Sequence, residues 1–270
     1  MNRKHTKYIN SKSSLVSILT PTFNRPSWLK ENLQSLVAQT YPHWECIVVN
    51  DFGEDVQPIV AEFRDERIKY FQNQQNLDLA ETRNIAISHS SGDYFICLDD
   101  DDGLMPESIE FRLWRAKKLN AEIVYSRVLQ CFYEKTNSEY KYIGEKIYWD
   151  CNYNRDLILV QNIAPVNGIM FSRKAQEAGG LFDKELKTGE DWDHNIAMSR
   201  LYPFYETKII DAYCSYRTDN NQMTGTRNFG IDIAKIFKKW RHTAENLAWV
   251  KENQNAILRQ MGILPEQYDL

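Results

Sequence analysis

Several features that mark common protein classes are missing from this chain of 270 residues. Its five cysteines are odd in number and widely spaced, with no CxxC pair, which argues against a disulfide framework and against a zinc site. Two of them, Cys46 and Cys97, lie within apolar runs and are interpreted as reduced core residues. The five histidines show no HExxH spacing, so any metal ligands are expected to be oxygen atoms.

Long apolar segments are also missing. No run reaches the roughly 18 residues that a membrane-spanning helix requires, and the best candidate, LILVQNIAPV from Leu157, is interrupted by Gln161 and Asn162. The first residues, MNRKHTKYINSKSS, are polar and basic, without the apolar core of a secretory signal. A formal net charge of -4 gives no reason to expect nucleic acid as a partner. These absences predict a cytoplasmic protein.

Short apolar runs alternate with segments of helical spacing through the first half of the chain. Strands are predicted for LVSILT, ECIVVN, IKYFQ, DYFICL and AEIVYSRV, with helices between them. Because these runs do not alternate with polar residues, a parallel sheet covered on both faces is expected. The prediction is an α/β fold, with a Rossmann-like, mostly parallel sheet flanked by helices and a C-terminal helical extension.

Polar clusters follow three of these predicted strands, at residues 20–25, 50–55 and 99–102. In open α/β sheets, ligands bind at the carboxyl ends of the strands. The three loops are therefore expected to gather at one edge of the sheet as a single site.

The third loop carries four consecutive aspartates, Asp99 to Asp102, within ICLDDDDGLMP. Adjacent like charges repel and are costly to desolvate, so such a run needs a cation or abundant water. Mg²⁺ and Mn²⁺ take carboxylate and phosphate oxygens together and neutralise charge that develops on a departing phosphate. A solvated acidic loop is the alternative. An EF-hand is excluded, because Leu98 and Ile109 stand where acids are required.

Three segments occur in a fixed order over about residues 14–220: VSILTPTFNRPSWLKENLQSLVAQTYPHWECIVVNDFGED, LAETRNIAISHSSGDYFICLDDDDGLMP and GEDWD. Together they resemble the family 2 glycosyltransferases, which have the GT-A fold and transfer a sugar from a nucleotide diphosphate sugar. The chain departs from the family pattern at Asn50, where a first Asp is usual, and at Phe52-Gly53, where Gly-Ser is usual.

For the donor, the resemblance implies a nucleotide pocket and a divalent metal, Mn²⁺ or Mg²⁺. The family's D-x-D pattern maps onto Asp99 and Asp101 as metal ligands, with Asp102 orienting its neighbours. Asp51 would accept a hydrogen bond from the base, most naturally uracil or thymine, so a UDP-sugar is the expected donor. Asp100 would reach the ribose and Arg83 would lie over the nucleotide or phosphate. The other residues that the resemblance assigns to the nucleotide pocket are Thr20, Pro21, Phe23 and Arg25.

For the transfer step, the resemblance implies that Asp191 of GEDWD is the catalytic base. An acceptor hydroxyl attacks the anomeric carbon as the diphosphate leaves from the other face, and the carboxylate takes the proton, so the anomeric configuration inverts. Glu190 would bind the acceptor hydroxyl and Trp192 would stack on a sugar face, while Asn167 and Gly168 would line the donor sugar. Helix capping is the alternative role for the acids of this motif.

The expected organisation is a single GT-A domain with an extension at each end. Its parts are a flexible N-terminus (1–13), a nucleotide-sugar-binding half (14–130), an acceptor-binding half (131–230) and a C-terminal helical extension (231–270). The stretch TDNNQMTGTRNFG is expected to be a mobile loop that closes over bound donor. In that stretch Asp219 stands where the family often has His.

The C-terminal extension is amphipathic. Basic residues surround an apolar helical face formed by Ile233, Ile236, Phe237, Trp240, Ala244 and Leu247. Three uses stay open: packing on its own domain, resting on an acidic membrane surface, or pairing with a second subunit. The second use would make the cytoplasmic protein peripheral at the inner face of the membrane.

The function expected from the resemblance is that of a metal-dependent, inverting hexosyltransferase. It would act on a hydroxyl of a glycan or lipid-linked acceptor in cell-surface polysaccharide synthesis. A phosphatase of the haloacid-dehalogenase type is an alternative, although that class expects Thr or Val at Leu104. A nucleotidyltransferase is another, although TPTFNRP lacks the glycine of its usual phosphate loop. The third is a nucleotide-sugar-binding subunit without activity.

Overall fold

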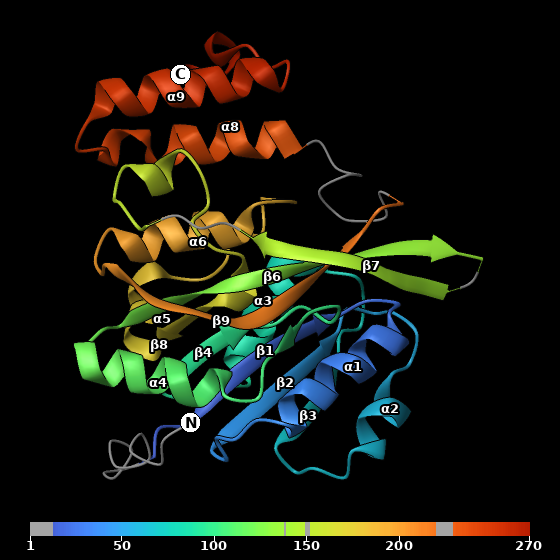
Figure 1. The fold of residues 1–270 in the computed structure, drawn as a ribbon. Helices are drawn as coiled ribbons and strands as arrows, with labels where there is room; N and C mark the ends of the chain where they lie inside the picture. Colours follow the sequence, from blue (N-terminus) through green and yellow to red (C-terminus); the bar gives the residue numbers. More distant parts are fainter. Residues whose placement is uncertain (1–12, 138, 149–151, 220–228) are drawn as a thin grey trace.

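The computed structural model describes residues 13–137, 139–148, 152–219 and 229–270 (Figure 1). The flexible N-terminus expected over 1–13 lies outside these residues except for its last position. Most of the loop expected to close over the donor also lies outside them, since only its first two and last two residues are described.

The described chain forms one sheet of nine strands, in the order β3-β2-β1-β4-β8-β6-β9-β5, with β7 paired to β6. The strand bounds are β1 (Val16–Thr22), β2 (Trp44–Asn50), β3 (Ile68–Gln72), β4 (Tyr94–Cys97), β5 (Gly103–Leu104), β6 (Ile123–Thr136), β7 (Glu139–Tyr148), β8 (Ile169–Ser172) and β9 (Phe204–Arg217). All five strands predicted in the first half of the chain are present. The predicted α/β class is confirmed.

Parallel pairing dominates the first half of the sheet, and mixed pairing the second. β1 is parallel to β2 and β4, and β2 is parallel to β3, because helical crossovers return the chain to the same end of the sheet. β8 is antiparallel to both β4 and β6, whereas β9 is parallel to β6. Between β6 and β8 the described chain forms β7 and two short 3-10 turns, η2 (Leu157–Leu159) and η3 (Val166–Gly168), and it enters β8 from the opposite end.

Helices cover both faces of the sheet (Figure 1). Their bounds are α1 (Pro26–Val37), α2 (Gln57–Glu62), α3 (Asp78–Ser88), α4 (Ser108–Leu119), α5 (Arg173–Gly179), α6 (Glu190–Ser199), α8 (Phe229–Trp240) and α9 (Leu247–Gln260).

Two apolar cores lie on opposite sides of the sheet, and successive residues of each central strand enter different cores. In β2, for example, Val48 packs with α1 and α4, whereas Ile47 and Val49 pack in the core of α3, α6 and α8. Burial on both faces explains why the strands read as continuous apolar runs.

The C-terminal extension packs on its own domain, the first of the three uses left open. Ile233, Ile236 and Phe237 of α8 are buried in the same core as α6. The extension is two helices and not one, because the Asp156 carboxylate accepts hydrogen bonds from the backbone N–H groups of Glu245 (2.8 Å) and Asn246 (2.7 Å). These two N–H groups therefore do not form the hydrogen bonds that a continuous helix would require.

Within the described ranges, no helix combines the length and the apolar character needed to cross a bilayer.

Candidate functional site

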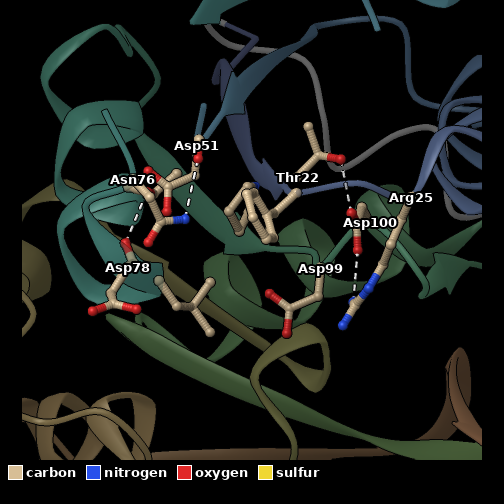
Figure 2. Close-up of a pocket in the computed structure, with 11 residues that line it drawn as sticks. Thr22, Arg25, Asp51, Asn76, Asp78, Asp99 and Asp100 are labelled. Atoms are coloured by element: carbon tan, nitrogen blue, oxygen red, sulfur yellow. Dashed lines mark hydrogen bonds and ion pairs between the residues drawn. The ribbon is translucent and has the colours of Figure 1, made fainter. Parts of the chain in front are cut away.

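A cavity of about 280 Å³ opens at the carboxyl ends of β1, β2 and β4 (Figure 2). The structure brings together here the loops that follow these three strands, as their positions in a parallel sheet require. The residues that line the cavity are Pro21, Thr22, Phe23, Arg25, Asp51, Asn76, Asp78, Leu79, Thr82, Asp99 and Asp100.

Asp51 lies at one end of the cavity, on the side of β2 and α3 (Figure 2). Its Oδ1 accepts hydrogen bonds from Asn73 Nδ2 and from the backbone N–H of Leu77, both at 2.8 Å. Its Oδ2 accepts none from the described residues. The carboxylate is thus held in place with one oxygen left to meet a ligand. Phe23, 46% exposed, offers an aromatic face in the wall of the same cavity.

The Asp51 end of the cavity also contains residues that were not predicted from the sequence. Asn76, Asp78, Leu79 and Thr82 form the wall that leads into α3. The amide Nδ2 of Asn76 donates to the backbone oxygen of Asp51 at 3.2 Å. These residues follow β3 in the chain. The signal that could have identified Asn76 is the polar run NQQN after the predicted third strand, and Leu79 and Thr82 lie at the start of the segment LAETRN.

At the other end of the cavity, the first aspartate pairs with a buried arginine. Arg83 is 1% exposed, and its guanidinium pairs with Asp99 at 2.6 Å and with Glu190. It is therefore a buried residue and not a surface arginine of α3. It joins the aspartate loop to the first turn of α6.

The middle aspartates are held by two further arginines. Arg25 Nη1 lies 3.0 Å from both Asp100 and Asp101, and Arg217 Nη1 lies 2.6 Å from Asp101. Asp100 also accepts a hydrogen bond from Thr22 Oγ1 at 2.8 Å. Burial raises the pKa of Asp100 to about 7, and the charge of Asp101 adds to that effect. The like charges are thus balanced in part by guanidinium groups supplied by other segments of the chain.

The fourth aspartate faces β9. Asp102 Oδ1 accepts the backbone N–H of Ser215 at 3.1 Å, and burial raises the pKa of this carboxyl well above its usual range. Asn32 Nδ2 donates to the backbone oxygens of Asp99 (2.8 Å) and Asp102 (3.0 Å), which fixes the turn between them.

The carboxylates of Asp99 and Asp101 fit a metal ion that is also bound by phosphate oxygens of a ligand. Among the described residues, no three His, Cys, Asp or Glu side chains cluster so as to hold a metal ion. Arginines occupy Oδ1 of Asp99 and Oδ2 of Asp101, which leaves the second oxygen of each carboxylate. Mg²⁺ is commonly bound by one or two carboxylates together with substrate phosphates. A metal held by protein groups alone does not fit these residues.

Asp191 lies in the first turn of α6, next to the Glu190 that pairs with Arg83. Its Oδ2 accepts a hydrogen bond from Asn162 Nδ2 at 3.2 Å. Burial raises the pKa of Asp191, while the charge of Arg83 opposes this rise. A carboxylate with a raised pKa is a better proton acceptor near neutral pH. Asn162, which sequence reasoning did not identify as a site residue, orients this group.

The neighbours of Asp191 are placed differently from the expectation. Trp192 is 6% exposed, donates from Nε1 to the backbone oxygen of Ile158 at 2.6 Å, and meets Phe237 edge to face. This corrects the expected stacking of Trp192 on a sugar, because the ring belongs to the core. Glu190 is buried against Arg83, and burial raises its pKa to about 7.

Three other expected contacts also lie inside the fold and not in the cavity wall. Asn167 is fully buried and donates from Nδ2 to the backbone oxygen of Tyr213 at 2.9 Å. Gly168 is buried beside Val128, whose Cγ2 would lie 2.9 Å from an added Cβ. Thr20 is fully buried within β1, so the cavity wall begins one residue later, at Pro21. Thr20 is enclosed because β1 is central in the sheet, and Asn167 and Gly168 are enclosed because η3 packs against β4, β6 and β9.

The fold is the GT-A fold of glycosyltransferases. The structure of TarS from S. aureus in complex with UDP-GlcNAc superposes with a TM-score of 0.68 at 16% identity, over 91% of this chain and 71% of TarS. The mannosyltransferase PcManGT from Pyrobaculum calidifontis, solved with GDP-Man and Mn²⁺, gives a TM-score of 0.59 at 12% identity, over 94% of this chain and 79% of PcManGT.

The chain belongs to glycosyl transferase family 2, whose family model matches residues 17–178. One relative, from Escherichia coli strain K12, is 30% identical over 188 residues, which is 68% of this chain and 66% of the relative. It is WcaA, a glycosyl transferase named for colanic acid biosynthesis.

Proposed function

We propose that the protein is an inverting, metal-dependent glycosyltransferase that moves a hexosyl group from a UDP-sugar to a hydroxyl of a glycan or lipid-linked acceptor. The observation that carries this proposal is that Asp51 and Asp99 line one cavity, while Arg83 pairs Asp99 with Glu190, the residue that precedes Asp191. Asp51 suits an N–H group of the nucleobase, Asp99 suits a metal ion at the diphosphate, and Asp191 suits the proton of the acceptor hydroxyl.

The donor base lies at the Asp51 end of the cavity. Oδ2 of Asp51 accepts the N3–H of uracil, while Asn73 and Leu77 hold Oδ1 and keep the carboxylate in position. Phe23 covers the face of the base. Support for a nucleotide sugar comes from TarS and PcManGT, whose structures contain UDP-GlcNAc and GDP-Man. Guanine also offers N–H donors, so the choice of base is part of the test.

The donor diphosphate lies at the aspartate end. Asp99 and Asp101 would hold Mn²⁺ or Mg²⁺, and Arg25, which lies beside both Asp100 and Asp101, would bind phosphate oxygens. When bound, the metal neutralises negative charge on the departing nucleoside diphosphate. PcManGT, solved with Mn²⁺, supports this assignment.

Asp191 is the catalytic base. The acceptor oxygen forms a bond to the anomeric carbon as the bond to the diphosphate oxygen breaks, and the hydroxyl proton passes to the Asp191 carboxylate. The electron pair of the broken bond leaves with the diphosphate. Asn162 holds Oδ2, so that the carboxylate keeps one orientation during the step. The relation to WcaA supports a role in cell-surface polysaccharide synthesis.

The test combines donor binding with turnover. Nucleotide release is measured from UDP-glucose, UDP-galactose, UDP-N-acetylglucosamine and GDP-mannose, with Mn²⁺, Mg²⁺ or EDTA. We expect a UDP-sugar to be the best donor, and we expect UDP with Mn²⁺ to raise Tm more than GDP does. Asp191→Asn should lower turnover by about 10²- to 10⁴-fold with UDP affinity unchanged. Full activity of that variant would refute the role of Asp191, and a Tm insensitive to every nucleotide would refute the donor class.

A further inference from the structure

The segment that leads into Asp191 is held by the C-terminal helix α8. Asp232 of α8 is buried, and its Oδ2 accepts the backbone N–H groups of Lys187 (3.0 Å) and Thr188 (3.1 Å) as well as the Thr188 hydroxyl (3.3 Å). A carboxylate that receives three hydrogen bonds fixes the position of their donors. We refer to residues 187–189 as the base loop.

The last residue of the base loop is Gly189, whose backbone is left-handed (φ +74°). L-residues with a side chain rarely adopt this conformation, so glycine suits the position. A Cβ added there would lie 3.1 Å from Ile236 Cδ1 and 3.7 Å from Ile233 Cδ1. The apolar face of α8 therefore lies directly against the turn that starts α6.

The same helix also holds α6 on the far side of Asp191. Lys239 Nζ lies 2.8 Å from Asp193 Oδ2, and Trp240 Nε1 donates to Asp193 Oδ1 at 2.6 Å. Asp191 is therefore bracketed by two anchors on α8, one three to four residues before it and the other two residues after it. Its backbone cannot shift without breaking at least one of them.

On its opposite side the base loop contacts the donor cavity. Lys187 Nζ pairs with Asp78 Oδ2 at 2.6 Å, and Asp78 belongs to the cavity wall. The base loop thus lies between the donor cavity and α8. The helix α8, which lies outside the family-matched residues 17–178, therefore holds this loop from the side away from the cavity.

We propose that Asp232 is a positioning residue for the transfer reaction, which sets the place of Asp191 by binding the base loop. The inference rests on the proposed role of Asp191 as the base. Misplacement of a reacting group by about 1 Å costs on the order of 100-fold in rate. The effect of Asp232 should appear mainly in kcat, because Asp232 does not line the cavity and the Lys187–Asp78 pair that joins the base loop to the cavity wall is exposed.

The experiment compares Asp232→Ala with Lys238→Ala in the full chain. Lys238 lies on the same helix but forms an exposed pair with Asp269, so its loss should leave kcat unchanged. For Asp232→Ala we expect kcat to fall by about 10- to 100-fold with donor KM and UDP affinity within about twofold. Hydrogen exchange of the Lys187 and Thr188 amides should become faster in Asp232→Ala only.

A conservative variant guards against loss of folding. Asp232→Asn keeps one oxygen that can accept both amides, so we expect it to recover most of kcat and of the exchange protection. Faster exchange in either variant with unchanged kcat would overturn the inference. Combining Asp232→Ala with Asp191→Asn separates the two proposals: no further loss of turnover supports positioning through Asp191, and an undiminished further loss refutes it. Full activity of Asp191→Asn alone would instead refute the proposed base.

Discussion

Three arginines pair with the first three of the four adjacent aspartates. Arg83 pairs with Asp99, while Arg25 and Arg217 share Asp101. Buried carboxylates are tolerated when cations and hydrogen-bond donors surround them. Arg25 and Arg83 were expected at the site from the sequence, whereas the sequence alone does not pair Arg217 with an aspartate. It is the last residue of β9, and the pairing of β9 with β5, the strand that directly follows Asp102, brings it to the aspartate loop.

His194 in α6 provides a residue-scale prediction about pH. Burial lowers the pKa of His194 to about 4 from 6.5, because its ring packs against Phe182 and is enclosed in the core. Between these values the unfolded chain binds more protons than the folded one, so stability falls as pH falls from 6.5 towards 4. The loss attributable to this group is about 3 kcal/mol when complete.

The measurement is the free energy of unfolding by denaturant from pH 4 to pH 8. His194→Gln should be less stable than the wild type at pH 8. Below pH 6.5 its free energy of unfolding should fall less steeply with falling pH, because about one proton fewer is taken up on unfolding. The same change at the exposed His242 controls for removal of an imidazole. Parallel curves for wild type and His194→Gln would contradict the prediction.

At the scale of elements, the short strand β5 holds the aspartate loop against β9. Gly103 directly follows Asp102 and pairs with Tyr213 in the sheet. The Tyr213 ring fills the space beside Gly103, so that an added Cβ would overlap it. Glycine is required here for close packing and not for an unusual φ. The GLMP turn signalled the end of the acidic run in the sequence, but its partner in β9 is more than 100 residues away.

Gly103→Ala should therefore destabilise the fold by about 1–3 kcal/mol, the usual cost of overpacking. It should also weaken Mn²⁺-dependent UDP binding, since Asp101 and Asp102 precede the strand. Without the Tyr213 ring there is no clash, so Gly103→Ala should have smaller effects on stability and on UDP binding when it is added to Tyr213→Ala than when it is added to the wild type. Denaturant unfolding and thermal shifts with UDP measure them, and additive losses in the double variant would argue against the clash.

For the whole molecule, the C-terminal helices are part of the main core. Phe237 of α8 is fully buried and meets Trp192 of α6 edge to face at 5.7 Å. Val250 and Leu258 of α9 belong to the same apolar cluster. Figure 1 shows these two helices, in orange and red, stacked beyond α6 on the side away from α4. The extension and the sheet should therefore unfold together.

Phe237→Ala should lower the free energy of unfolding by about 3–5 kcal/mol, as expected for a large cavity in a core. The denaturation curve should keep one transition by both far-UV circular dichroism and tryptophan fluorescence. Phe237→Leu, which keeps most of the apolar volume, serves as the milder comparison. An early separate transition confined to the C-terminal helices would show that they form an independent unit.

The five strands predicted in the first half of the chain, the α/β class and the three polar loops after β1, β2 and β4 follow from the sequence, because apolar periodicity and strand-end chemistry are local properties. The partners of those residues were decided by tertiary structure. Trp192 and Asn167 were expected at a ligand but are enclosed in the fold, since sheet order and helix packing determine which side of a residue is covered. Asn162 and Asp232 reach the Asp191 segment from distant parts of the chain. Contacts of such long sequence separation leave no periodic signal, and only the folded chain brings them together.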